Sequence, residues 1–361
     1  MQLLRLHPWD LVKDFGKLAT VVRPICWRGA TDMHRRDFIT LVGGTVAMCP
    51  LAARTQQPGK MRRVGVLSGR LRPTSIEASA LGGFTQGMRE LGYIEGRDFV
   101  IEWRFAEGKY EAISALAAEL VRLNVDVIVV ITPPAVRSLQ GMTTTIPIVM
   151  GFSTDPVGNG FVTSLARPGG NITGLASSSD DASPKQLELL TMIVPGLSRV
   201  GVLTNPGSLN SLPVMKSIQM AAQKIGLSIV PVEAANTQEI SDAFATLTKE
   251  RVGAVMTAPD AFFNSNLKLI AELAIGNRMP SIYSQGEYTE AGGLMSYGQN
   301  LRDFLRHAAS FVDKIFKGAK AADLPIEQPT KFTLVVNRKT ADTLGLKIPH
   351  QLVMFADHLI E

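Results

Sequence analysis

The sequence has few of the residues that reactive or metal-binding sites need. It contains 2 cysteines and 5 histidines among 361 residues. Both cysteines, Cys26 and Cys49, precede residue 61, so the remainder has no disulfide and no thiolate for catalysis or metal binding. No phosphate loop, GxGxxG fingerprint, HExxH helix or GxSxG elbow occurs either. We therefore expect no cofactor, no metal and no enzymatic activity, with an exported α/β hydrolase or lyase using paired carboxylates as the remaining enzymatic alternative.

The excess positive charge is confined to the N-terminus. The formal net charge is +5, and residues 1–60 supply all of it with nine Lys/Arg against four Asp/Glu. The body of the chain is neutral overall and has no long basic run. Because binding of a polyanion needs clustered Lys and Arg, we expect no nucleic-acid partner.

The N-terminal segment resembles a twin-arginine export signal. Arg35 and Arg36 precede an apolar run that ends near Ala53 and is too short for a permanent membrane helix. Residues 33–58 are therefore predicted to be a cleaved signal, and residues 1–32 an over-called or disordered extension before a start at Met33. A lipidation motif has a small residue where Met48 stands, so lipid attachment at Cys49 is the less favoured alternative. The predicted location is the periplasm.

The body contains an internal duplication. The run Arg-Val-Gly-Val-Leu-Ser at 63–68 recurs as Arg-Val-Gly-Val-Leu-Thr at 199–204. Each run precedes an amphipathic helix, expected at 79–91 and 212–225, that closes on Gly92 or Gly226. Helices from residues 113 and 240 then lead to strands at 127–131 and 254–257, and a third pair of strands is expected at 147–151 and 280–283. This order predicts two similar units.

Alternating helices and nearly all-apolar strands predict an α/β fold with parallel sheets flanked by helices, arranged as two similar lobes. The boundary is expected near Gly174. A long helix at 301–316 and a strand at 332–336 indicate that the chain recrosses between the lobes and so forms a hinge. The expected lobes are 61–174 with about 299–326, and 175–298 with about 327–361.

Polar residues follow the predicted strands at the edge where open parallel sheets bind ligands. Asp155 and Asp260 could take an ammonium group, and Arg70 a carboxylate. The helix N-cap is the alternative role for Ser68, Asp155, Asn205 and Asp260, and a solvated surface position is the alternative for Arg70. The predicted ligand-binding residues are Ser68, Arg70, Thr132, Pro133, Asp155, Asn205, Asp260, Ser284 and Gln285.

Several motifs together resemble the uncharacterised ABC-transporter substrate-binding family of bacteria. They are Arg35-Arg36-Asp37-Phe38, Gly92-Tyr93-Ile94-Glu95-Gly96-Arg97, Arg167-Pro168-Gly169-Gly170-Asn171-Ile172-Thr173-Gly174 and Gly292-Gly293-Leu294-Met295-Ser296-Tyr297-Gly298. The resemblance implies the type I periplasmic binding protein fold, with two Rossmann-like lobes and about three hinge crossings. It also implies separately encoded permease and ATPase partners, and relatives that look like binders of aromatic amino acids.

The sequence therefore predicts a monomeric, exported binding component of an ABC importer. We expect it to capture a small polar ligand, with amino acids favoured, in the cleft between the lobes. A ligand-sensing subunit for a membrane receptor or kinase is the non-enzymatic alternative.

Overall fold

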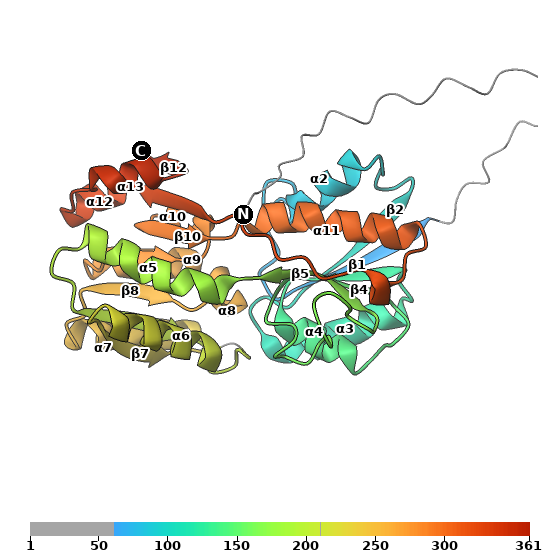
Figure 1. Cartoon of the computed structure of the whole chain (residues 1–361), viewed down its shortest axis with the longest axis horizontal. Helices are drawn as coiled ribbons and strands as arrows, with labels where there is room; N and C mark the ends of the chain where they lie inside the picture. Colours follow the sequence, from blue (N-terminus) through green and yellow to red (C-terminus); the bar gives the residue numbers. More distant parts are fainter. Residues whose placement is uncertain (1–60, 210) are drawn as a thin grey trace, which may run out of the picture. The chain divides into compact units, whose positions relative to one another are not determined.

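The described part of the chain contains two sheets, each covered by helices on both faces (Figure 1). A computed structural model describes residues 61–209 and 211–361, without the side chains of 179–181. The described residues belong to one compact unit. The predicted signal, the start at Met33 and Cys49 lie outside the described residues. No helix in the described part is both long and apolar enough to cross a membrane.

The first sheet has five parallel strands in the order β2-β1-β3-β4-β5. They are β1 (Arg62–Ser68), β2 (Phe99–Phe105), β3 (Val127–Val130), β4 (Ile148–Thr154) and β5 (Ile172–Ser177). Helices α2 (Gly82–Glu90) and α11 (Leu301–Phe316) pack on one face, and α3 (Ile113–Arg122) and α4 (Pro133–Gln140) pack on the other (Figure 1). The sheet and these helices are called the first lobe below.

The second sheet has seven strands in the order β12-β11-β10-β9-β8-β6-β7, parallel except for the pair β10–β11. They are β6 (Arg199–Thr204), β7 (Ser228–Glu233), β8 (Ala254–Thr257), β9 (Ser281–Tyr283), β10 (Met295–Gly298), β11 (Thr333–Asn337) and β12 (His358–Ile360). One face carries α5 (Ser179–Ile193), α6 (Ser211–Lys224), α12 (Arg338–Leu344) and α13 (His350–Phe355). The other carries α7 (Thr237–Lys249), α8 (Ala261–Ser265), α9 (Leu267–Gly276) and α10 (Gly286–Glu290). This sheet and its helices are the second lobe.

The structure confirms the predicted duplication. The strand order β2-β1-β3-β4-β5 is repeated as β7-β6-β8-β9-β10, and the two matching sequence runs lie in β1 and β6. Gly92 and Gly226 have φ values of 90° and 74°, the left-handed conformation that ends a helix most easily when no side chain is present. The predicted α/β architecture with two similar lobes is therefore correct.

Several predicted boundaries differ from the structure, and strands β2, β5, β7, β10 and β12 were not predicted. Helix α2 begins at Gly82 rather than 79, and α7 begins at Thr237 rather than 240 because the Asn236 side chain caps it by accepting from Glu239 N. Strand β5 runs through Gly174, the expected lobe boundary, to Ser177. Strands β2 and β7 are edge strands of their sheets and carry charged residues or proline, so neither forms an all-apolar run.

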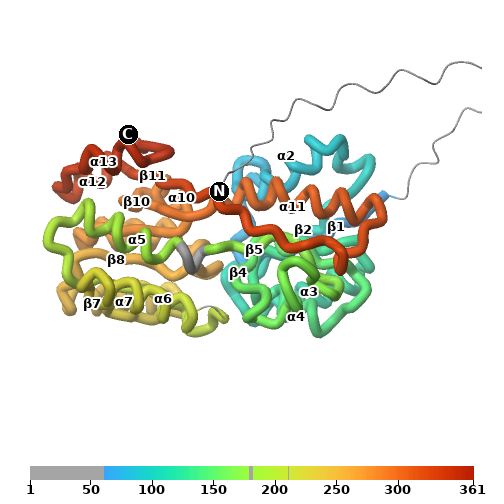
Figure 2. The backbone as a smooth tube through the Cα atoms, in the orientation of Figure 1, coloured from blue at the N-terminus to red at the C-terminus, as the bar shows by residue number. Residues whose placement is uncertain are grey.

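Three segments connect the lobes: 177–179 after β5, 298–301 between β10 and α11, and 324–333 before β11 (Figure 2). The buried Gln299 side chain belongs to the second of these segments and bonds to the other two. Its Oε1 accepts from Ser177 Oγ at 2.8 Å and from Ser178 N at 3.1 Å, and its Nε2 donates to the carbonyl of Pro329. Gln299 is 6% exposed. One side chain thus fixes the spacing of the hinge segments.

Candidate ligand-binding cleft

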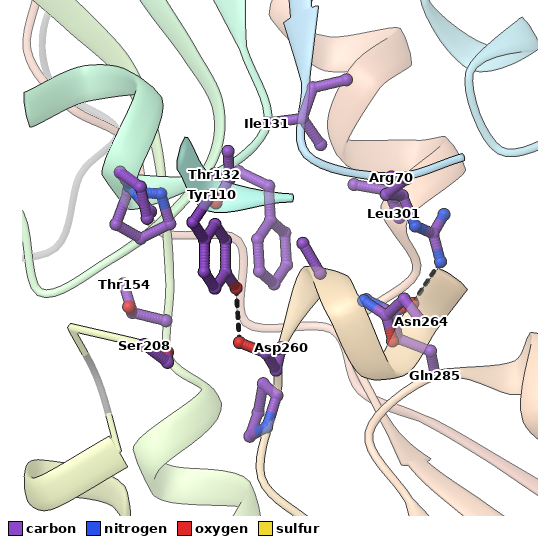
Figure 3. Close-up of a pocket in the computed structure, with 15 residues that line it drawn as sticks. Arg70, Tyr110, Ile131, Thr132, Thr154, Ser208, Asp260, Asn264, Gln285 and Leu301 are labelled. Carbon is purple, nitrogen blue, oxygen red and sulfur yellow. Dashed lines mark hydrogen bonds between the residues drawn. The ribbon is translucent and has the colours of Figure 1, made fainter. Parts of the chain in front are cut away.

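A cavity lies where the strand ends of the two lobes face each other (Figure 3). Its first-lobe residues follow β1, β2 and β3, lie near the end of β4 or begin α11, and its second-lobe residues follow β6, β8 and β9. With the lobes arranged as described, its volume is about 50 Å³. Its lining comprises Arg70, Tyr110, Ile131, Thr132, Pro133, Pro134, Phe152, Thr154, Ser208, Pro259, Asp260, Ala261, Asn264, Gln285 and Leu301.

Asp260 is the hydrogen-bonding centre of the second-lobe wall. Its Oδ1 accepts from Phe262 N at 2.9 Å and Phe263 N at 3.3 Å, which caps α8, and from Asn205 Nδ2 at 3.1 Å. Its Oδ2 accepts from the Tyr110 hydroxyl of the first lobe (Figure 3). Burial raises the pKa of Asp260 although these bonds act in the opposite direction. The carboxyl group therefore joins the lobes as well as capping a helix.

Tyr110 stays a hydrogen-bond donor over the whole physiological pH range. Burial, followed by the charge of Asp260, raises the pKa of the Tyr110 hydroxyl far above its usual value. The ring also lines the cavity beside the apolar side chains of the first lobe (Figure 3). Tyr110 thus combines an aromatic surface with a fixed polar contact.

Arg70 carries the positive charge of the cavity lining. Its side chain is 13% exposed and forms a two-pronged ion pair with Glu287 of the second lobe. Nη1 donates to Oε1 of Glu287 at 3.2 Å, and Nη2 donates to Oε2 of Glu287 and, at 2.8 Å, to Oε1 of Gln285. Ser68 Oγ accepts from Arg70 N at 3.2 Å and holds the loop in place. A planar guanidinium held in this way is suited to carboxylate recognition.

The first-lobe wall offers hydroxyl groups and apolar surface rather than amide donors. Thr132 is the N-cap of α4 without a side-chain capping bond, and Pro133 and Pro134 occupy the first two helical positions. Proline has no N–H, so this helix end cannot hold an anion through its first amides. Phe152 and Leu301 complete an apolar surface beside the two prolines.

The predicted site residues fall into three groups. Arg70, Thr132, Pro133, Asp260 and Gln285 line the cavity, while Ser284 and Gln285 line a smaller one beside it. Ser68 and Asn205 lie behind the wall, where Asn205 bonds both Asp260 and, through Oδ1 at 2.9 Å, Gly207 N. Asp155 is exposed and outside the lining, and its Oδ1 accepts from Gly158 N at 2.8 Å within its own turn.

Sequence reasoning missed other lining residues. Tyr110 follows the unpredicted edge strand β2, where the alternation of apolar and charged residues at 101–105 was the available signal. Asn264 lies one turn into α8, and Leu301 is the first residue of α11, so neither belongs to a loop that directly follows a strand. Among the described residues, no group of three or more His, Cys, Asp or Glu could hold a metal ion.

Two α/β lobes joined by three segments, with a cavity between their strand ends, define a two-lobed binding protein. Residues 74–360 match the family described as ABC transporter substrate binding protein, and the chain belongs to this family. Members of the family are binding components of transporters rather than enzymes, as the sequence predicted.

Individual relatives agree with this assignment. A tyrosine-binding protein of Clostridioides difficile is 26% identical over 266 residues, which cover 73% of this chain and 76% of that protein. A conserved domain protein of Vibrio cholerae has a similar structure, with a TM-score of 0.77, 27% identity, and coverage of 83% of this chain and 100% of that one. A Streptococcus pneumoniae ABC domain in complex with L-Trp has a TM-score of 0.76, 27% identity and the same coverage. The predicted type I periplasmic binding protein fold is confirmed.

Proposed function

We propose that this protein is the extracytoplasmic receptor of an ABC importer for an amino acid with an apolar or aromatic side chain. The carrying observation is that one half-buried arginine, one buried aspartate and an apolar wall line the same cavity. A zwitterion with an apolar side chain has complementary groups for all three. The tyrosine and tryptophan ligands of two relatives, each about one quarter identical, support the same class.

In this proposal Arg70 binds the ligand carboxylate through its paired N–H groups. Asp260 Oδ2 accepts one hydrogen bond, from Tyr110, and has lone-pair capacity for a ligand ammonium. Tyr110, Phe152 and Pro133 pack against the ligand side chain. The hydroxyl groups of Thr132 and Ser208 supply further polar contacts.

The ligand would stabilise one arrangement of the lobes, which a membrane permease then recognises before a separate ATPase drives import. The twin-arginine pattern at Arg35 and Arg36 supports delivery to the periplasm. The chain would act as a monomer, with the permease and ATPase as its protein partners.

A thermal-shift screen against amino acids, sugars, nucleosides and small carboxylates tests the ligand class. A ligand at 100 times its dissociation constant stabilises a protein by about 2.7 kcal/mol, which raises Tm by several degrees. We expect tyrosine, tryptophan or phenylalanine to raise Tm and to be recovered unchanged. A sugar or nucleoside as the best ligand would contradict the amino-acid proposal, and conversion of the ligand to a product would contradict a receptor.

Arg70→Gln tests the assigned carboxylate contact. Loss of a charged hydrogen-bonding partner, worth about 1.5–3 kcal/mol, should weaken amino-acid binding about tenfold to a hundredfold in calorimetry. Arg72→Gln is the matched control, because Arg72 is an exposed arginine of the same loop that lies over the Phe105 ring outside the cavity lining. Equal affinities of both variants for the amino acid would show that Arg70 does not contact the ligand.

A further inference from the structure

The Arg70–Glu287 pair joins the two lobes at a cavity that is too small for an amino acid. With the pair formed, the cavity measures about 50 Å³, whereas pockets that bind small molecules measure about 300–1,000 Å³. A water molecule needs about 10–15 Å³, so this space holds only a few waters. An amino acid can enter only if the contacts between the lobes change.

Glu287 presents to Arg70 the same group that an amino-acid ligand would present. Both of its carboxylate oxygens accept from the two terminal nitrogens of the guanidinium. A ligand carboxylate needs those same two N–H donors and the same plane. Glu287 and the ligand therefore cannot both form the two-pronged contact with Arg70.

The two members of the pair are not equally held. The Arg70 side chain is 13% exposed and stays bonded to Gln285, whereas the Glu287 side chain is 32% exposed. Glu287 also borders a second cavity of about 280 Å³, whose other lining residues include Asn300, Arg302 and His358. Exchange would thus move the carboxylate of Glu287 toward water and polar groups, while the guanidinium keeps its place.

We propose that Glu287 is an internal competitor for the carboxylate site on Arg70, and that a ligand binds by displacing it. The inference rests on the proposed function, since it assigns the regulation of the same site. Glu287 sets a threshold in this arrangement: ligands without a carboxylate cannot replace it, and ligands with one bind more weakly than the bare arginine would allow.

The test compares Glu287→Gln with wild type by calorimetry, using L-tyrosine, L-tryptophan and L-tyrosinamide as probes. Glutamine keeps the shape of the side chain, but its neutral hydrogen bond to Arg70 is about half as strong as that of the carboxylate. We expect the variant to bind tyrosine or tryptophan about tenfold more tightly, and not to gain affinity for tyrosinamide, which lacks the carboxylate. Glu290→Gln is the matched control, because Glu290 lies on the same helix and lines the second cavity but not the first.

Each outcome separates this inference from the proposed function. Unchanged or weaker binding of tyrosine and tryptophan by Glu287→Gln, with wild type still binding them, overturns the competitor role and leaves the receptor proposal intact. Binding by the variant alone supports the competitor role. If neither protein binds either amino acid, both proposals for these ligands fail. Equal Tm values of the two glutamine variants exclude a folding defect as the source of a difference.

Discussion

Replacing Gln299 with leucine should lower the free energy of unfolding, because the Gln299 side chain forms the hydrogen bonds that link the hinge segments. Leucine has nearly the same volume, but it removes one donor and one acceptor group from a site that is 6% exposed. Three hydrogen bonds are lost, to Ser177, Ser178 and Pro329. At about 1 kcal/mol net for each bond, the free energy of unfolding should fall by about 3 kcal/mol.

Urea unfolding followed by circular dichroism measures this loss, and Gln186→Leu supplies the matched control. Gln186 is also buried, at 3% exposure, but its side chain makes one such hydrogen bond, from Nε2 to the carbonyl of Tyr297 at 2.7 Å. Its replacement should therefore cost about 1 kcal/mol. Equal losses in the two variants, or a loss below about 1 kcal/mol in Gln299→Leu, would refute the assignment of Gln299 as the link between the three segments.

Two further predictions concern pH and packing. Burial raises the pKa of four of the five tyrosines, which are Tyr93, Tyr110, Tyr283 and Tyr288. The pKa of Tyr93 rises to about 12. Tyrosines of the unfolded chain ionise near pH 10, so these four groups should not change the stability below pH 10, and the stability should fall as pH rises from 10 toward 12. Tm measured against pH tests this, and a flat profile to pH 12 would contradict it. Gly83→Ala should cost about 1–3 kcal/mol in urea unfolding, because its Cβ would lie 2.1 Å from the carbonyl oxygen of Arg302 where α2 meets α11. Gly276→Ala, in open space at the end of α9, should cause no such loss, and equal effects of the two alanines would show that α2 can move away from α11.

Much of the fold could be predicted because the central strands have a strong local signal. Strands β3 and β8 are fully buried and nearly all apolar, and β1 and β6 repeat almost the same sequence. The edge strands β2 and β7 lack this signal because they are only partly buried and carry charged residues. Glu102 and Arg104 in β2 form an ion pair with each other at 3.6 Å, which no apolar pattern reveals.

The site was predicted to the level of loops but not of side-chain partners. The rule that ligands bind beyond the carboxyl ends of parallel strands selected Arg70, Thr132 and Asp260, which all line the cavity. The rule gives no directions for side chains, so it selected Asp155 as well, whose carboxylate turns back to its own loop. Glu287, the partner of Arg70, is 217 residues away in sequence and lies on the other lobe. The sequence could not predict this pair, because the contact depends on how the two lobes meet.

The edge strand β7 has a consequence for how concentrated solutions of this protein behave. Edge strands expose a row of unpaired backbone groups that can recruit a second chain and begin aggregation. In β7 the proline at 231 removes one N–H from that row, and Glu233 adds a negative charge at the end of the strand. A second molecule therefore meets an interrupted, charged edge, and growth of the sheet from one copy to the next is discouraged at this side of the second lobe.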